Sequence, residues 1–192
     1  MPAHHSSGWH RAGLTAGVPV GNSSLVRRLR AGDRQAAAEI VDLYYRQIYL
    51  YMRRLGHSRQ VSEDLTQESF LQAWQHIDQL RDDGALSAWL YRIAGNASRL
   101  YWRRHRYDKP AAVEHLEITA DSGDAGQMGK FEELERLQKA VAALPPKFRE
   151  VIVLHYMQHL TISEAAEAVS VRPGTFKSRL NRALKALRRQ MG

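Results

Sequence analysis

The chain of 192 residues contains no cysteine, which excludes a disulfide framework and any thiolate metal site. It has no apolar run approaching the ~18 residues of a membrane-spanning helix, so we expect no membrane insertion. Its first residues lack the apolar segment of a secretory signal, which favours a cytoplasmic location. No segment alternates apolar and polar residues with the period of a strand. The sequence therefore predicts an all-α protein.

Positive charge is what the chain has in excess, with 28 Lys and Arg against 20 Asp and Glu and a net charge of +8. Residues 25–106 contain 14 basic and 9 acidic residues, and residues 131–192 contain 11 and 6. Residues 107–130 reverse this balance, with 2 basic and 5 acidic residues. Basic blocks of this kind are typical of polyanion binding. The distribution predicts contact with nucleic acid at two separate places.

Helical periodicity predicts two small domains joined by a linker. The segments are a disordered tail rich in Gly, Ser, His and Ala (1–24), an upstream helical domain (25–106), a flexible acidic linker without sustained periodicity (107–130) and a downstream helical domain (131–192).

Three long helices are expected in the upstream domain. The first ends at Gly56, and a turn over residues 57–59 follows. The second spans about 62–76 with Ser62 as its cap, and the third spans about 86–106. In the downstream domain, Pro145 and Pro146 separate two helices ahead of the C-terminal motif.

Residues 161–189 have the pattern of a helix-turn-helix. Thr161 and Glu164 form a capping box, and Pro173 suits the first position of the second helix. Regular spacing predicts a buried face made of Phe176, Leu180, Ala183 and Leu187. The opposite side suits a helix that enters the major groove, although a solvated basic face is the ordinary alternative. Its candidate DNA-binding residues are Arg172, Thr175, Lys177, Ser178, Arg179 and Arg182.

The third upstream helix combines a cationic stripe with aromatic rings, which suits melted or single-stranded nucleic acid. Its apolar face predicts a core made of Leu86, Leu90, Ile93, Ala97 and Leu100. The alternative is that the tryptophans belong to the core; we expect this of Trp89 but expect Trp102 to be functional. The candidate nucleic-acid residues are Arg92, Asn96, Arg99, Trp102, Arg103, Arg104 and Arg106.

The second upstream helix carries an acidic and amide patch formed by Asp64, Gln67, Glu68 and Leu71, at spacings that place them on one face. Such a patch on a basic protein favours a protein partner over DNA. Ordinary helix-surface charge is the alternative.

Four motifs in this order resemble the sigma-70 family of bacterial RNA polymerase sigma factors, in its small extracytoplasmic-function (ECF) type. The resemblance covers about residues 24–190. The motifs are D-L-T-Q-E-S-F-L-Q-A-W (64–74), A-W-L-Y-R-I-A-G-N-A (88–97), L-P-P-K-F-R-E-V (144–151) and P-G-T-F-K-S-R-L-N-R-A (173–183).

The resemblance implies a non-enzymatic promoter-specificity subunit without cofactor or metal. Asp64, Gln67 and Glu68 would dock on the clamp helices of the polymerase β′ subunit. The loop 80–86 and the helix through Asn96 and Arg99 would read the melted minus-ten element, with Arg103 and Arg104 on nearby backbone. The helix-turn-helix would bind the minus-thirty-five element, and the linker would thread through the polymerase. The implied partners are core RNA polymerase (β′ clamp helices and β flap), promoter DNA and an anti-sigma factor.

Three residues depart from the family pattern: Ser170 replaces a frequent turn glycine, Phe176 replaces a β-branched residue, and Gly95 interrupts the third helix. Two other functions compete with this one. A free-standing helix-turn-helix regulator normally needs a dimer surface, and no dedicated dimerisation helix is evident. A metal-dependent nuclease would use Asp64 and Glu68, but the nine histidines show no spaced ligand set.

Overall fold

The computed structural model describes residues 22–105 and 128–191, and their regular elements are helical. The upstream unit contains α1 (Asn22–Arg30), α2 (Arg34–Arg54), α3 (Arg59–Gln75), the short turns η1 (Ile77–Gln79) and η2 (Asp83–Ala85), and α4 (Leu86–Arg104). The downstream unit contains α5 (Met128–Ala143), α6 (Pro146–Ile152), η3 (Val153–Met157), α7 (Ile162–Ala168) and α8 (Pro173–Met191). The predicted linker lies almost entirely outside the described residues.

Two predicted boundaries in the upstream unit need correction. Residues 22–24, which we assigned to the tail, form the first turn of α1, where the side-chain amide of Asn22 donates to the Tyr44 hydroxyl at 2.7 Å. The cap of α3 is Ser58 rather than Ser62. Ser58 has the extended backbone that a cap requires, and its hydroxyl accepts from the Val61 amide at 3.3 Å. Ser62 is instead buried inside the helix.

The predicted apolar face of α4 is confirmed, since Leu86, Leu90, Ile93 and Ala97 are all buried, while Leu100 is half-buried. Trp89 is also buried, as expected of a core residue. The structure adds a second buried side to α4 that periodicity did not reveal. It includes Tyr91, Ala94, Gly95 and Ser98.

The downstream helix-turn-helix forms as the sequence predicts. Thr161 and Glu164 make the reciprocal capping box, in which the Thr161 amide donates to the Glu164 carboxylate at 2.8 Å. Helix α8 begins at Pro173, and its four predicted apolar residues are buried. One departure lies upstream, where the helix expected after Pro145 and Pro146 widens after Ile152 into the π-helical turn η3.

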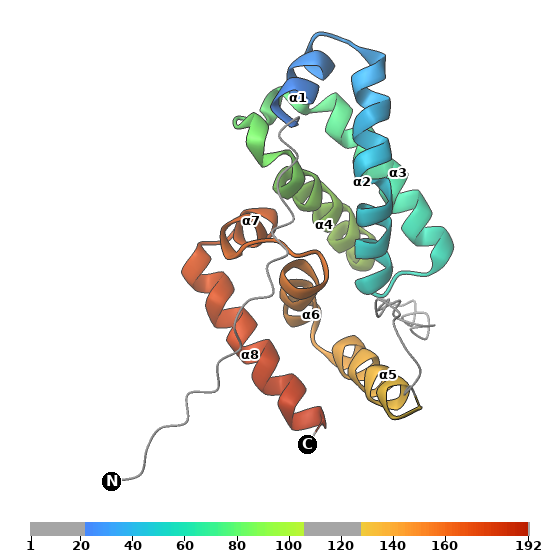
Figure 1. Ribbon diagram of the computed structural model, residues 1–192, viewed down its shortest axis with the longest axis vertical. Helices are drawn as coiled ribbons and strands as arrows, with labels where there is room; N and C mark the ends of the chain where they lie inside the picture. The colour runs from blue at the N-terminus through green and yellow to red at the C-terminus, as the bar shows by residue number, and fades with distance from the viewer. Residues whose placement is uncertain (1–21, 106–127, 192) are drawn as a thin grey trace.

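The two units pack against each other. Helix α7 lies against α4, and η3 lies against α2 (Figure 1). The buried apolar side chains of both units belong to one hydrophobic cluster. The sequence alone suggested two domains placed independently, because the apolar seam between them is spread over short segments. Within the described ranges, no helix combines the length and apolar character needed to cross a membrane.

Candidate nucleic-acid and polymerase interfaces

Helix α8 presents the predicted recognition face to solvent. Its apolar stripe is buried against α5, α6 and α7, which turns the polar stripe outward. Arg179 is half-buried, and the other five predicted residues (Arg172, Thr175, Lys177, Ser178 and Arg182) are exposed. The Ser178 hydroxyl donates to the Gly174 carbonyl at 3.0 Å, which leaves its oxygen able to accept further bonds. The face combines cationic donors and small polar side chains, as direct reading of base edges requires.

The turn before α8 contains Ser170, one of the three departures from the family pattern. Ser170 has a φ of 54°, in the left-handed region that favours glycine. Two backbone bonds hold this conformation: the Ser170 amide donates to Glu167 and the Val171 amide donates to Ala166 at 2.9 Å. The turn geometry therefore persists at a cost in backbone strain.

Helix α4 brings most of its predicted stripe to the surface. Asn96, Arg99, Arg103 and Arg104 are exposed and Arg92 is half-buried. Arg106 lies outside the described residues.

Trp102 is partly a structural residue. Its ring is half-buried and stacks on His57, with centroids 4.8 Å apart and planes 19° apart. His57 is only 3% exposed, and its Nε2 lies 2.7 Å from the Ser98 hydroxyl. Burial, with a smaller contribution from the charge of Arg149, lowers the pKa of His57 to about 4. The His57 imidazole is therefore neutral at neutral pH, where it stacks on the Trp102 indole. Only part of the Trp102 ring remains accessible for stacking on a base.

A polar cluster ties two predicted DNA-binding residues to the downstream unit. The Arg99 guanidinium contacts the Glu150 carboxylate at 2.5 Å and donates to the Asn96 side-chain oxygen Oδ1 at 2.6 Å. The Tyr51 hydroxyl donates to the same carboxylate at 3.2 Å. Burial raises the pKa of Glu150, and the nearby charges of Arg99 and Arg179 only partly offset this shift. No role was predicted for Glu150, although it lies within the motif over 144–151.

The predicted minus-ten loop is anchored on α1. The Arg30 guanidinium contacts the Asp83 carboxylate at 2.8 Å and donates to the Leu80 carbonyl. Within the loop, the Asp82 carboxylate accepts from the Gly84 amide at 2.9 Å. These bonds fix the loop beside the start of α4.

Helix α3 displays the predicted docking patch as a single exposed face. Asp64, Gln67, Glu68 and Leu71 are all exposed, and Leu71 is 54% exposed although it is large and apolar. The other side of α3 is buried through Leu65, Phe70 and Ala73. An apolar side chain between carboxylates suits contact with a protein surface better than contact with phosphates.

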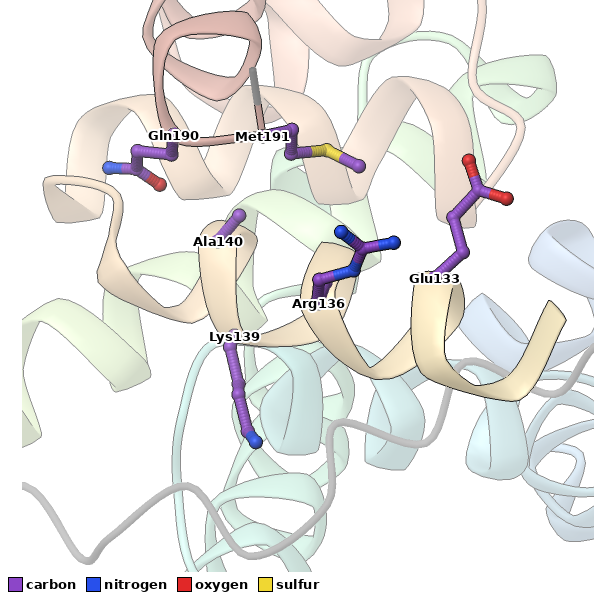
Figure 2. A pocket seen from close by; sticks show the side chains of 6 residues that line it. All are labelled: Glu133, Arg136, Lys139, Ala140, Gln190 and Met191. Carbon is purple, nitrogen blue, oxygen red and sulfur yellow. The ribbon is translucent and has the colours of Figure 1, made fainter. Parts of the chain in front are cut away.

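A hollow of about 350 Å³ lies between α5 and the end of α8 (Figure 2). Its lining mixes acidic, basic, amide and apolar groups. In the part of the chain that the structure describes, no three His, Asp or Glu side chains gather as a metal site. The lining residues are Glu133, Arg136, Lys139, Ala140, Gln190 and Met191.

Two family models match the chain, one in each unit. Sigma-70 region 2 matches residues 40–107, and sigma-70 region 4 matches residues 134–187. The first match includes the docking patch and α4, and the second includes the helix-turn-helix.

Curated relatives match over most of their own length. SigW of Bacillus subtilis, an ECF RNA polymerase sigma factor, is 35% identical over 86% of this chain and 94% of its own. SigM of Mycobacterium tuberculosis (strain Erdman) is 30% identical over 89% and 85%. The ECF sigma-E factor of Salmonella typhimurium (strain LT2) is 31% identical over 85% and 90%.

Two solved structures share the fold. CnrH, in complex with the cytosolic domain of CnrY, has a TM-score of 0.65 and 22% identity, and covers 87% of this chain and 94% of its own. The sigma factor RpoE of Bartonella quintana, in complex with the anti-sigma factor NepR, has a TM-score of 0.60 and 24% identity, over 80% and 95%. The all-helical architecture is thus shared at low sequence identity.

Proposed function

The chain belongs to the ECF group of sigma-70 family RNA polymerase sigma factors, which direct promoter-specific transcription initiation, and from this premise we propose which surface performs each step. The presence of both region 2 and region 4 disfavours a free-standing helix-turn-helix regulator. We assign region 2 to residues 25–106, region 4 to residues 131–192 and the connection between them to residues 107–130.

The patch on α3 docks on core polymerase, at the clamp helices of the β′ subunit. Asp64 and Glu68 supply negative charge, and Leu71 supplies apolar contact area. Charged residues in such a patch speed association with an oppositely charged partner. The apolar side chain adds affinity when it is buried in the interface. The β flap contacts region 4 in the same assembly.

Helix α4 and the loop over 80–86 hold the melted minus-ten element. Arg92, Arg99, Arg103, Arg104 and Arg106 neutralise phosphates, while Asn96 and Trp102 meet bases. Stacking on an aromatic ring contributes about 1–3 kcal/mol per base. The anchored loop beside α4 supports this assignment, because a base flipped from a duplex needs a rigid receiving site.

Helix α8 reads the minus-thirty-five element as duplex. Arg172, Thr175 and Arg179 lie near its N-terminal turns, where recognition helices contact base edges. Lys177, Ser178 and Arg182 complete the face. Each bidentate contact from arginine to guanine discriminates by about 1–3 kcal/mol.

The protein acts in the cytoplasm, where core polymerase and the chromosome meet, and it has no catalytic chemistry of its own. Because the Bartonella RpoE has been solved with the anti-sigma factor NepR, an anti-sigma factor is also proposed as a partner of this chain.

The exposed patch on α3 is the observation that carries the proposed function, because every later step requires the chain to be bound to core polymerase. Measuring the affinity for core polymerase tests this docking assignment. Replacing Asp64 and Glu68 by Ala should weaken binding on the order of tenfold, since paired interface charges are lost. Replacing Asp42 and Asp78 by Ala is the matched control, because both are exposed acids of the same unit. Equal affinity of the two double variants for core polymerase would refute the docking assignment.

A further inference from the structure

The loop that we assign to the minus-ten element is a short exposed arch between two buried side chains. Leu80 and Leu86, at its two ends, are 3% and 1% exposed, whereas Asp82 and Gly84 between them are exposed. Within the arch, the Asp82 carboxylate accepts from the Gly84 amide and the Asp82 carbonyl accepts from the Ala85 amide, both at 2.9 Å. These bonds shape the arch, but they do not hold its middle against the rest of the unit.

One side chain from outside the loop contacts both its start and its middle. The guanidinium of Arg30, the last residue of α1, contacts the Asp83 carboxylate through Nη1 at 2.8 Å and donates to the Leu80 carbonyl through Nη2. The side chains of the ion pair are only 30% and 23% exposed, so water and salt screen it less than a pair on an open surface. Arginine suits this position because its rigid planar fork reaches two acceptors at once.

A contact from α1 can fix the loop because α1 is itself held on α2. The Arg28 guanidinium contacts the Asp33 carboxylate at 2.7 Å and the Glu39 carboxylate at 3.1 Å, across the corner between the two helices. Leu25 and Val26 of α1 are buried in the core. Helix α1 also packs against the short turns η1 and η2 on either side of the loop (Figure 1). The loop is therefore anchored on a helix that carries no residue assigned to DNA.

We propose that Arg30 is a positioning residue for minus-ten recognition: it touches no DNA, and it holds the loop over 80–86 in the conformation that receives a base. The inference rests on the proposed assignment of this loop to the minus-ten element. A loop that is already ordered loses little conformational entropy when a base binds, whereas a free loop must be ordered first. Binding of the preferred base is then reduced by the fraction of loops in the receiving conformation. Loss of Arg30 should therefore weaken discrimination between bases at this loop.

A direct contact from Arg30 to a phosphate is the competing role, and its partner distinguishes the two. Arg30→Ala removes a positive charge, whereas Asp83→Ala removes a negative one. A phosphate contact predicts opposite effects, because losing Arg30 weakens binding to every sequence and losing Asp83 strengthens it. Positioning predicts the same effect in both variants, since either substitution releases the loop. The double variant should then lose no more than either single variant.

Hydrogen exchange followed by mass spectrometry measures the anchor. Amides over 80–86 should exchange about tenfold faster in Arg30→Ala and in Asp83→Ala than in the wild type, because local opening sets their exchange rate. Arg27→Ala is the matched control with the same charge change, since Arg27 is exposed on the same helix and its guanidinium donates to the Ser23 carbonyl at 3.3 Å. Unchanged loop exchange in Arg30→Ala would overturn the anchor and leave the loop assignment intact.

Exchange over α2 and α8 in the same experiment reports whether the variants remain folded. It should match the wild type in all of them. If Arg30→Ala loses protection over α2 as well, Asp83→Ala decides, because it removes only the loop side of the contact. Unchanged loop exchange in that variant would equally overturn the anchor.

Transcription by reconstituted holoenzyme measures the consequence on a barcoded promoter pool randomised in both elements. In Arg30→Ala and Asp83→Ala, preference for the best base should fall by up to about tenfold at the minus-ten position that the loop reads, and should stay unchanged in the minus-thirty-five element. Arg27→Ala should keep both preferences. A released loop with unchanged minus-ten preference would overturn the loop assignment, and positioning with it. A uniform loss over all sequences in Arg30→Ala, with a gain in Asp83→Ala, would overturn positioning in favour of a phosphate contact.

Discussion

The two helices assigned to promoter DNA, α4 and α8, carry similar cationic stripes but differ in what surrounds them. Helix α8 is buried along one apolar stripe, and its polar side faces solvent. Helix α4 is buried on two sides, and Arg99 at the edge of the second side is already paired with Glu150. Similar charge patterns therefore do not imply equal availability. What differs is whether a residue of the stripe is already paired with a charged side chain from another part of the chain.

The small residues on the second side of α4 explain this difference. Ala94, Gly95 and Ser98 leave a shallow surface on which the downstream unit can pack. On α8 the corresponding stripe carries long cationic side chains that would have to be desolvated beneath a covering helix. The cost of burying those charges keeps α8 open.

The largest expected effect comes from shortening a side chain in the apolar stripe that holds α8 in place. Phe176 is a fully buried residue of this stripe, and Phe176→Ala should lower the free energy of unfolding by about 3–5 kcal/mol. Denaturant titration followed by circular dichroism measures the change. The exposed neighbour Thr175→Ala should change stability by less than about 0.5 kcal/mol. Similar losses in both variants would show that α8 is not held by its apolar stripe.

Acid should lower the free energy of unfolding by protonating His57, which packs against Ser98 and Trp102 of α4. Its folded pKa lies near 4, below the ordinary 6.5, because burial and then Arg149 disfavour the charged ring. The resulting stability is fully present above about pH 6.5 and is lost as the pH falls towards 4. The loss should be about 3 kcal/mol, from 1.36 kcal/mol per pKa unit.

Unfolding of the wild type and of His57→Phe at pH 7 and pH 4.5 measures this contribution. The variant keeps an aromatic ring beside Trp102 but cannot gain a proton. Its stability should therefore fall less between the two pH values. An identical pH dependence of both proteins would contradict the low pKa of His57.

DNA binding by the free chain should distinguish the two stripes. Arg182 is exposed on α8, and Arg182→Ala should weaken duplex binding by about 1–3 kcal/mol if it contacts a base. If it contacts a phosphate, the slope of log K against log salt should fall by about 0.9 instead. Arg92→Ala on α4 should change duplex binding little, but should impair promoter opening by holoenzyme. Equal effects of the two variants on duplex binding would contradict the assignment of duplex DNA to α8 and of melted DNA to α4.

The smallest expected effect concerns the turn that sets the angle between α7 and α8. Ser170→Gly should raise stability by about 1 kcal/mol, because glycine adopts the observed φ of 54° without strain. Ser163→Gly, inside α7, should instead lower stability by about 0.5 kcal/mol, because serine is a better helix former than glycine. Thermal unfolding of the two variants measures both shifts. A destabilised Ser170→Gly would show that the Ser170 side chain has a role beyond the turn.

Local signals in the sequence predicted most of the candidate surfaces. The α3 patch and the α8 face are exposed as predicted. A strong apolar stripe orients α8, whereas the buried side of α3 also contains Ser62, Thr66 and Ser69. The cap of α3 was placed wrongly, since Ser58 and Ser62 both fit a cap and only the backbone conformation distinguishes them. The partial burial of Trp102 depends on His57, which lies far away along the chain.

The sequence by itself determined the helical class, the helix-turn-helix, the positions of the cationic stripes and the family. These follow from periodicity, capping residues and side-chain charge, all of which act within a few residues. Only the tertiary structure decided that Glu150 meets Arg99, that Gly95 makes room for it and that His57 is held neutral. Each of these depends on contacts between segments separated by some forty to a hundred residues, which signals that act within a few residues cannot reveal.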